Sequence, residues 1–164
     1  MVNDAKHKDI VITRVFDAPV ERVWKAFTDP KQVERWWGPE TFTSHSAKID
    51  LRVGGKYLFC MRGPAGSPFD MDMWSGGTYK EIVPMKKIVA TDHFADKDGN
   101  EIPASTMGMP GDWSQEMIVT FTFEDLGNRK TKLTLKHEGH PIEMAKDATS
   151  GWNTSLDKLA ASLK

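Results

Sequence analysis

The chain has 164 residues, enough for one domain with a sizeable core, and a formal net charge of −1, which argues against nucleic acid as a partner. A single cysteine, Cys60, excludes a disulfide within the chain and a four-cysteine zinc site. There is no long apolar run and no apolar signal segment near the start, so we expect a soluble, cytoplasmic protein with no membrane partner.

The first part of the chain predicts one strand and two short helices. Residues 10–16 alternate in character and are rich in β-branched side chains, which is typical of a strand. Pro19 then begins a helix at a position where its missing N–H costs nothing. The apolar face of that helix comprises Val20, Val23, Trp24 and Phe27. Asp29 and Pro30 begin a second, shorter helix that ends near residues 36–39.

Six further strand signals follow, separated by turn residues. They cover residues 41–51, 56–62, 71–83, 86–94, 117–124 and 131–138. Within the third, Gly76 and Gly77 predict a bulge or a close backbone approach. From about residue 142 the apolar positions recur every three or four residues, which indicates a long amphipathic helix.

This order of elements predicts the fold class. A run of strands joined by short turns favours an antiparallel sheet, and its apolar face must be covered. The C-terminal helix is the predicted element long enough to cover it. We therefore predict a single α+β domain over residues 1–164, with a curved antiparallel sheet of about seven strands wrapped around that helix.

A long Gly- and Pro-rich loop over residues 96–113 interrupts the strands. It does not match a calcium loop, because Gly99 stands fourth from Asp96 where an EF-hand needs glycine sixth. The loop carries Met107, Met109 and Trp113. These side chains could form a hydrophobic lid over a cavity or a plug for the core, and the sequence leaves both open.

The sequence contains no recognisable catalytic or metal motif. The five histidines, His7, His45, His93, His137 and His140, lack metal-ligand spacing, so we expect no metal and no cofactor, and the catalytic residues are unknown. His137 shares a face with Leu133 and Leu135 and should point inward. It is interpreted as a satisfied core residue, with a polar ligand anchor or a proton-transfer group as alternatives. Cys60 is interpreted as structural, because nothing near it in the sequence suggests activation.

The positive evidence for function is apolar. Six Trp, eight Phe and nine Met are many bulky side chains for one small domain. Met adapts to irregular gaps and varied guests, which favours a pliable apolar pocket, although an ordinary core is the alternative for each residue. The candidate ligand-binding residues are Trp37, Phe42, Tyr57, Phe59, Met61, Met73, Met117, His137 and Trp152.

Several motifs also resemble a known family. The segments 12–19 (ITRVFDAP) and 28–30 (TDP) resemble the start of the START-like (SRPBCC) superfamily. Further segments narrow this to the family of activator of heat-shock-protein-ninety ATPase homologues, of the C-terminal-domain type. They are 36–39 (WWGP), 50–55 (DLRVGG), 61–64 (MRGP), 79–84 (YKEIVP), 137–139 (HEG), 151–152 (GW) and 156–159 (LDKL).

The resemblance implies a helix-grip fold and a cavity between the sheet and the C-terminal helix that takes hydrophobic small molecules or lipids. The expected function is therefore binding of a small hydrophobic or amphipathic ligand, such as a lipid or a polyketide-like or aromatic compound. One alternative is an enzyme acting on such a ligand. The other is a co-chaperone that stimulates the ATPase of the ninety-kilodalton heat-shock protein, which would make that chaperone a partner. The oligomeric state is left open.

Overall fold

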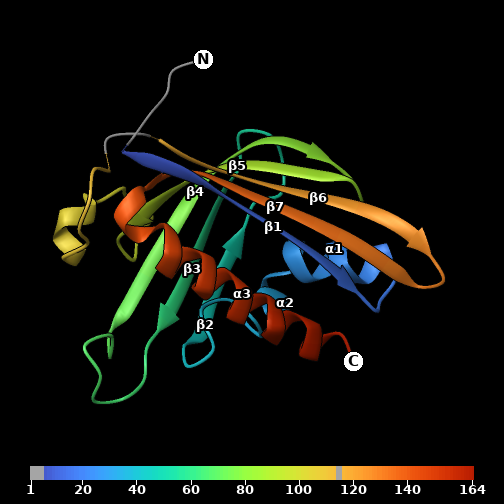
Figure 1. Cartoon of the computed structure of the whole chain (residues 1–164), viewed down its shortest axis with the longest axis horizontal. Coiled ribbons are helices and arrows are strands. Elements are labelled where there is room, and N and C mark those ends of the chain that lie inside the picture. Colours follow the sequence, from blue (N-terminus) through green and yellow to red (C-terminus); the bar gives the residue numbers. More distant parts are fainter. Residues whose placement is uncertain (1–5, 114–115) are drawn as a thin grey trace.

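The described residues of this computed structural model, 6–113 and 116–164, are built around one antiparallel sheet. Among them, seven strands pair in the order β1-β7-β6-β5-β4-β3-β2 (Figure 1). The strands are β1 (His7–Phe16), β2 (Thr43–Ile49), β3 (Lys56–Arg62), β4 (Asp72–Val83), β5 (Lys87–Ala95), β6 (Met117–Gly127) and β7 (Lys130–Pro141). Because β1 pairs with β7, the first strand lies beside the last one.

The helices follow the first and last strands. They are α1 (Val20–Thr28), α2 (Pro30–Val33) and α3 (Ala145–Ser162), with short 3-10 helices η1 (Ala104–Met107) and η2 (Ile142–Met144). The Asp29 side chain accepts a hydrogen bond from the Lys31 N–H, and Pro30 occupies the first helical position of α2, as its sequence predicts. The long helix α3 crosses one face of the sheet, which curves around it (Figure 1).

The core lies between that face and α3. Leu133 and Leu135 on β7 and Leu156 and Leu159 on α3 are fully buried, whereas Val11 on the other face of β1 is 61% exposed. This alternation follows from the two-residue period of a strand.

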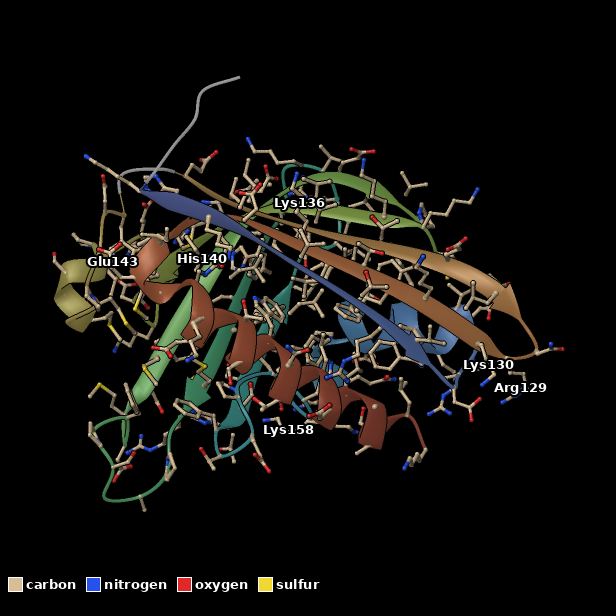
Figure 2. All side chains as sticks on the ribbon, in the orientation of Figure 1. Arg129, Lys130, Lys136, His140, Glu143 and Lys158 are labelled. Atoms are coloured by element: carbon tan, nitrogen blue, oxygen red, sulfur yellow. The ribbon has the colours of Figure 1, made fainter. Side chains whose placement is uncertain are left out.

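Two sets of polar contacts connect α3 to the rest of the fold. Arg14 on β1 pairs with Asp157 on α3 at 2.7 Å. Lys158 on α3 (Figure 2) donates to the carbonyl oxygens of Pro39 and Phe42, at 3.1 and 2.9 Å, and its partial burial lowers its pKa. The hydrogen bonds of Lys158 connect the segment after α2 to α3.

The predicted fold class and element order are confirmed, with bounds that differ by a few residues. The strand predicted to end at residue 138 continues to Pro141, because a bulge opposite Lys8 and Ile10 absorbs the irregular backbone at Gly139. The final helix begins at Ala145 because residues 142–144 form a 3-10 turn.

The predicted close approach at the paired glycines is also present. A Cβ atom on Gly77 would collide with the Thr91 carbonyl oxygen, and the β4–β5 register shifts just beyond it. Separately, none of the helices within residues 6–113 and 116–164 is both long enough and apolar enough for a membrane crossing.

Candidate functional site

A small cavity lies in the core between the sheet and α3. Its volume is about 30 Å³, which is close to the share of one water molecule in the liquid. Most of its wall is aromatic: Phe27, Trp36, Trp37, Tyr57, Phe59, Tyr79, Phe121 and Trp152. Among the described residues of that wall, Asp92 alone carries a charge, and its side chain is 16% exposed.

Asp92 belongs to a chain of four polar side chains from β3, β5, β7 and α3. The Tyr57 hydroxyl donates to the Thr91 carbonyl oxygen at 2.8 Å and lies 3.1 Å from Asp92 Oδ1. The other carboxylate oxygen, Oδ2, lies 2.9 Å from Nε2 of His137. At the far end, Trp152 Nε1–H donates to His137 Nδ1 at 3.0 Å.

The Trp152 contact fixes the protonation of His137. An indole N–H can only donate, so Nδ1 of His137 must accept, and the ring proton is inferred to sit on Nε2, facing Asp92. A second proton on Nδ1 would face the indole N–H, donor against donor. Nε2 lacks a well-aligned hydrogen bond, so the 2.9 Å approach to Asp92 is an attraction between a charge and a dipole. Nδ1 of His137 is thus taken up by Trp152, and Nε2 faces the Asp92 carboxylate.

Burial keeps the neighbouring groups uncharged as well. It raises the pKa of Tyr57 well above the usual range, and the charge of Asp92 adds to that effect. Burial also lowers the pKa of His140 to about 4, with the adjacent His137 as the second cause. The two histidine rings lie 4.2 Å apart between centroids. Tyr57 and His140 are therefore uncharged at neutral pH.

Trp37 supplies a donor without a partner. Its Nε1 atom is buried, and no acceptor among the described residues reaches it. The ring belongs to the cavity wall, where it packs against Phe59 and Trp152. An unpaired buried N–H costs about 1–3 kcal/mol, so an acceptor brought within reach of this atom would stabilise the site.

A larger hollow lies beside the long loop. Its volume is about 470 Å³, and its wall includes Trp113 from the loop and Phe94 and Met117 from the strands, together with charged side chains such as Lys80 and Glu101. Asp92 belongs to the walls of both spaces. Trp113 packs on Phe94 and His140, with ring centroids 5.2 and 6.2 Å away. One face of the loop thus borders a space of ligand size.

The structure brings together five of the nine residues predicted to bind a ligand. Trp37, Tyr57, Phe59 and Trp152 line the small cavity, and His137 bonds to Trp152. The remaining four lie elsewhere. Met117 lines the larger hollow, Phe42 packs against Phe69, and Met61 pairs with Met73 across β3 and β4.

Of the three residues predicted to form a lid, one lines the larger hollow and two do not. Trp113 lines the hollow. Met107 and Met109 are half-buried and belong to neither wall. The aromatic residue of the loop, rather than its two methionines, faces the candidate site.

Sequence reasoning missed Asp92. The signal was present, because Ile88, Ala90 and Asp92 alternate along β5 and the first two are buried on the inner face. A carboxylate in phase with buried apolar residues is unusual and marks a candidate functional position.

Cys60 lies on the opposite face of the sheet from this cavity, since Phe59 beside it points inward. Its sulfur is 3.7 Å from Nε2 of His45, a neighbour that the sequence did not suggest because it comes from another strand. Burial, and then the charge of Asp72, raise the pKa of the thiol to about 11. The thiol is therefore protonated at neutral pH and is not an activated nucleophile.

Comparisons with known proteins agree with this fold. A structure from Chromobacterium violaceum is 34% identical, with a TM-score of 0.74, and the alignment covers 94% of this chain and 96% of that one. A structure from Arthrobacter aurescens is 27% identical, with a TM-score of 0.73 and coverage of 94% and 85%. The AHSA1 protein from Silicibacter pomeroyi, 24% identical with a TM-score of 0.71 over 95% and 97% of the chains, shows the shared fold. No curated protein matches the chain.

The family comparison covers nearly the whole chain. The model of the family described as "Activator of Hsp90 ATPase homolog 1-like protein" matches residues 17–164. This span begins at the end of β1 and includes the cavity, the polar chain and α3. The chain therefore belongs to the Activator of Hsp90 ATPase homolog 1-like family.

Proposed function

We propose that the protein binds a small, largely apolar ligand that carries one hydroxyl or N–H group, held between the sheet and α3. The observation that carries this proposal is the polar chain Tyr57–Asp92–His137–Trp152, which holds a carboxylate in an aromatic wall. Apolar walls with a few convergent polar groups are typical of small-molecule sites. The polar group of the ligand would reach this wall, and Asp92 would accept its hydrogen bond.

The charges at the site favour an alcohol over an acid. Asp92 is the acidic residue in the wall of the small cavity, and the described residues of that wall include no Lys or Arg. A ligand carboxylate about 4 Å from Asp92 would be repelled by about 4 kcal/mol at an effective dielectric constant of 20. A phenol or alcohol instead donates to Asp92, and its oxygen can accept from the unpartnered N–H of Trp37.

The volumes of the two spaces limit where the ligand can lie. A cavity of about 30 Å³ cannot hold an aromatic ring, whereas the 470 Å³ hollow is within the size range of small-molecule pockets. The two spaces share Asp92. We therefore place the body of the ligand against the hollow, with its polar group at Asp92 and the loop 96–113 as a lid that moves with Trp113.

Two matched probes test this proposal. Isothermal titration should detect binding of 2-naphthol, and 2-naphthoate should bind at least about tenfold more weakly because of its charge. Asp92→Asn should reduce that difference, and Asp125→Asn, at an exposed position on β6, is the matched control. Ala90→Val fills the cavity wall from a residue 2% exposed and should abolish binding while the chain stays folded. Equal affinity for both probes would contradict the proposal.

A second candidate function is proton transfer on such a ligand. The observation that favours it is the Asp92 carboxylate at the cavity wall, 2.9 Å from Nε2 of His137. A carboxylate in that position can act as a general base toward an acidic C–H bond. The probe is 2-tetralone, whose α-protons exchange with D2O. Exchange faster than in buffer, and its loss in Asp92→Asn, would indicate an enzyme. Exchange at the buffer rate would rule out this reaction and leave ligand binding as the proposed function.

A further inference from the structure

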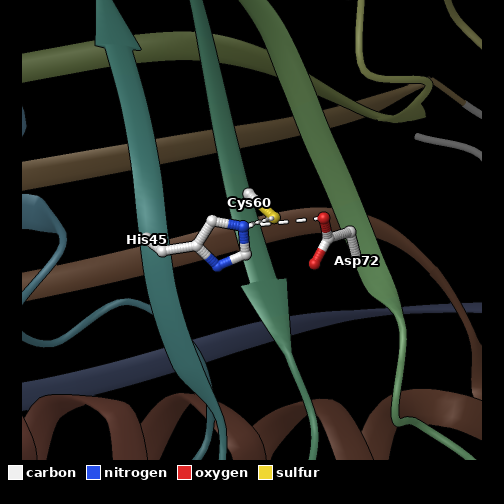
Figure 3. Close-up of side chains that lie close together, drawn as sticks. All are labelled: His45, Cys60 and Asp72. Carbon is white, nitrogen blue, oxygen red and sulfur yellow. Dashed lines mark hydrogen bonds and ion pairs between the residues drawn. The ribbon is translucent and has the colours of Figure 1, made fainter.

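We propose that His45, Cys60 and Asp72 form a zinc-binding site on the face of the sheet opposite α3. The three side chains come from β2, β3 and β4 and converge on one point (Figure 3). One ligand atom from each lies within 4.8 Å of the others. The site shares no residue with the cavity wall, so this proposal is independent of the ligand proposed above.

The spacing of the ligand atoms matches a tetrahedral zinc site. With Zn–S near 2.3 Å and Zn–N and Zn–O near 2.0–2.2 Å, tetrahedral angles place N and S about 3.6 Å apart, and N and O about 3.4 Å apart. The observed separations are 3.7 Å from His45 Nε2 to Cys60 Sγ and 3.5 Å from His45 Nε2 to Asp72 Oδ2. The third separation, between the Cys60 sulfur and the Asp72 carboxylate, is at most 4.8 Å, so an approach to about 3.6 Å completes the site around a cation.

A β-bulge brings His45 to this place. Thr43 pairs with Arg62 and Ser46 pairs with Cys60, so two residues of β2, Ser44 and His45, oppose a single residue of β3. In a regular strand, His45 and Ser46 would point to opposite faces, and His45 would point away from Cys60. Bulges re-aim side chains in this way and are common beside functional sites.

The geometry is that of a metal site rather than of a catalytic triad. In a Cys–His–Asp relay the nucleophile and the acid contact different nitrogens of the histidine ring. Here both contacts of His45 are made by Nε2. One nitrogen cannot serve both partners in a relay, whereas three donor atoms around one point suit a cation.

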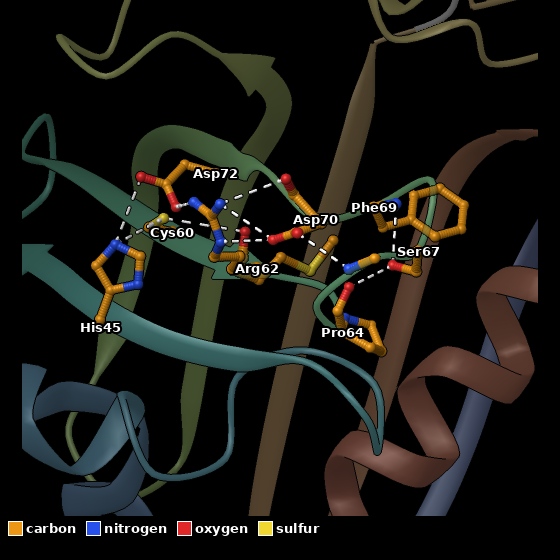
Figure 4. A network of polar contacts seen from close by, with 10 residues as sticks. His45, Cys60, Arg62, Pro64, Ser67, Phe69, Asp70 and Asp72 are labelled. Atoms are coloured by element: carbon orange, nitrogen blue, oxygen red, sulfur yellow. Dashed lines mark hydrogen bonds and ion pairs between the residues drawn. The ribbon is translucent and has the colours of Figure 1, made fainter.

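Arg62 orients the third ligand. It pairs with Asp72 Oδ1 at 3.1 Å and with Asp70 Oδ1 at 3.1 Å, and Asp70 accepts from the N–H of Gly66 (Figure 4). Oδ2 of Asp72 is thereby left facing His45. Contacts that orient a ligand through its second atom are typical of metal sites.

The donor set and the exposure point to zinc. A cysteine sulfur disfavours Mg²⁺ and Ca²⁺, and nitrogen, sulfur and oxygen together suit Zn²⁺. The His45 and Asp72 side chains are 53% and 38% exposed, which gives the cation a route and leaves room for water as the fourth ligand. On binding, the sulfur coordinates as thiolate and its proton passes to the buffer.

Titration of the full chain, without a histidine tag, with Co²⁺ and then Zn²⁺ tests the proposal. We expect one Co²⁺ per chain, a thiolate-to-cobalt charge-transfer band in the near ultraviolet, strong visible bands of tetrahedral cobalt, and loss of all of them on adding Zn²⁺. Zn²⁺ at a hundredfold excess over its Kd should raise the melting temperature by roughly 5–10 °C. Absence of the charge-transfer band would overturn the proposal.

Variants at exposed positions decide the ligand set. His45→Gln and Asp72→Asn should each weaken zinc binding at least about tenfold, as losses of metal-site contacts do. The matched controls, His93→Gln on β5 and Asp125→Asn on β6, should keep the wild-type affinity. Cys60→Ser should abolish the charge-transfer band. If that buried substitution fails to fold, the two exposed positions still decide, and unchanged affinity in both would overturn the proposal.

Discussion

The polar groups on the two faces of the sheet differ in their exposure and in the ligand that they suit. Toward α3, Asp92 lies among aromatic rings, and its polar contacts are the Tyr57 hydroxyl and the His137 ring. On the other face, His45 and Asp72 are partly exposed, and their donor atoms converge with the Cys60 sulfur. The first arrangement suits a neutral hydrogen-bond donor with an apolar body, and the second suits a cation. Because successive residues of a strand point to opposite faces, Phe59 and Cys60 place both sites on one strand.

This comparison predicts that the helix-facing site stabilises the fold and that the other site does so when metal is bound. Trp152→Ala should lower the free energy of unfolding by about 3–5 kcal/mol, since it removes a large ring packed on Trp37 and Phe121 and leaves Nδ1 of His137 unpaired. Trp152→Phe keeps a ring and should cost about 1–2 kcal/mol. Urea unfolding measures both, and a loss below about 1 kcal/mol in the alanine variant would place the ring outside the core.

The next largest effect concerns pH. Burial lowers the pKa of His140 to about 4 in the folded chain, below its ordinary value near 6.5. The unfolded chain therefore binds the proton first, and stability falls as the pH drops from about 6.5 toward 4. Between pH 7.5 and 5 this group should contribute a loss of about 2 kcal/mol. His140→Gln should show a correspondingly smaller loss in urea unfolding at the two pH values, and an identical loss would contradict the buried, neutral state.

Tyr57→Phe tests the polar chain at its other end. It removes a hydroxyl that donates to Thr91 and approaches Asp92, and it keeps the ring in the cavity wall. We expect the free energy of unfolding to fall by about 1–1.5 kcal/mol. An unchanged value in urea unfolding would indicate that the hydroxyl has an equivalent partner in solvent.

The smallest effect on stability is expected at Arg62. This exposed side chain pairs with Asp70 and Asp72, and Arg62→Gln should leave the melting temperature of the metal-free protein unchanged. Its zinc affinity should nevertheless fall about tenfold, because the Asp72 carboxylate is no longer oriented. A large loss of stability without metal would make the cluster an ordinary structural ion-pair network.

The sequence predicted the fold well because periodicity is a local property. The two-residue alternation in residues 56–62 and the three- and four-residue steps from Met144 to Leu163 are visible in any short window. The same alternation correctly grouped Tyr57 with Phe59 in the cavity wall. The same alternation along β5 places Asp92 on the inner face of the sheet.

The remaining features depend on contacts between strands. His45 reaches Cys60 through an extra residue in β2, and a bulge shifts side chains in a way that local alternation does not reveal. The cavity volume depends on how large rings such as Trp37 and Phe121 pack, and small displacements change it. The sequence suggested a partly hollow core, whereas the larger space lies beside the loop.

The indole N–H signals of Trp37 and Trp152, assigned with Trp37→Phe and Trp152→Phe, test the ligand site most directly. In a two-dimensional nitrogen–proton spectrum during titration with 2-naphthol, we expect saturable shifts of both signals, because Trp37 gains an acceptor and Trp152 belongs to the same wall. We also expect 2-naphthoate to leave both signals in place. Unshifted signals at the solubility limit of 2-naphthol, or equal shifts with both probes, would contradict the proposed ligand site.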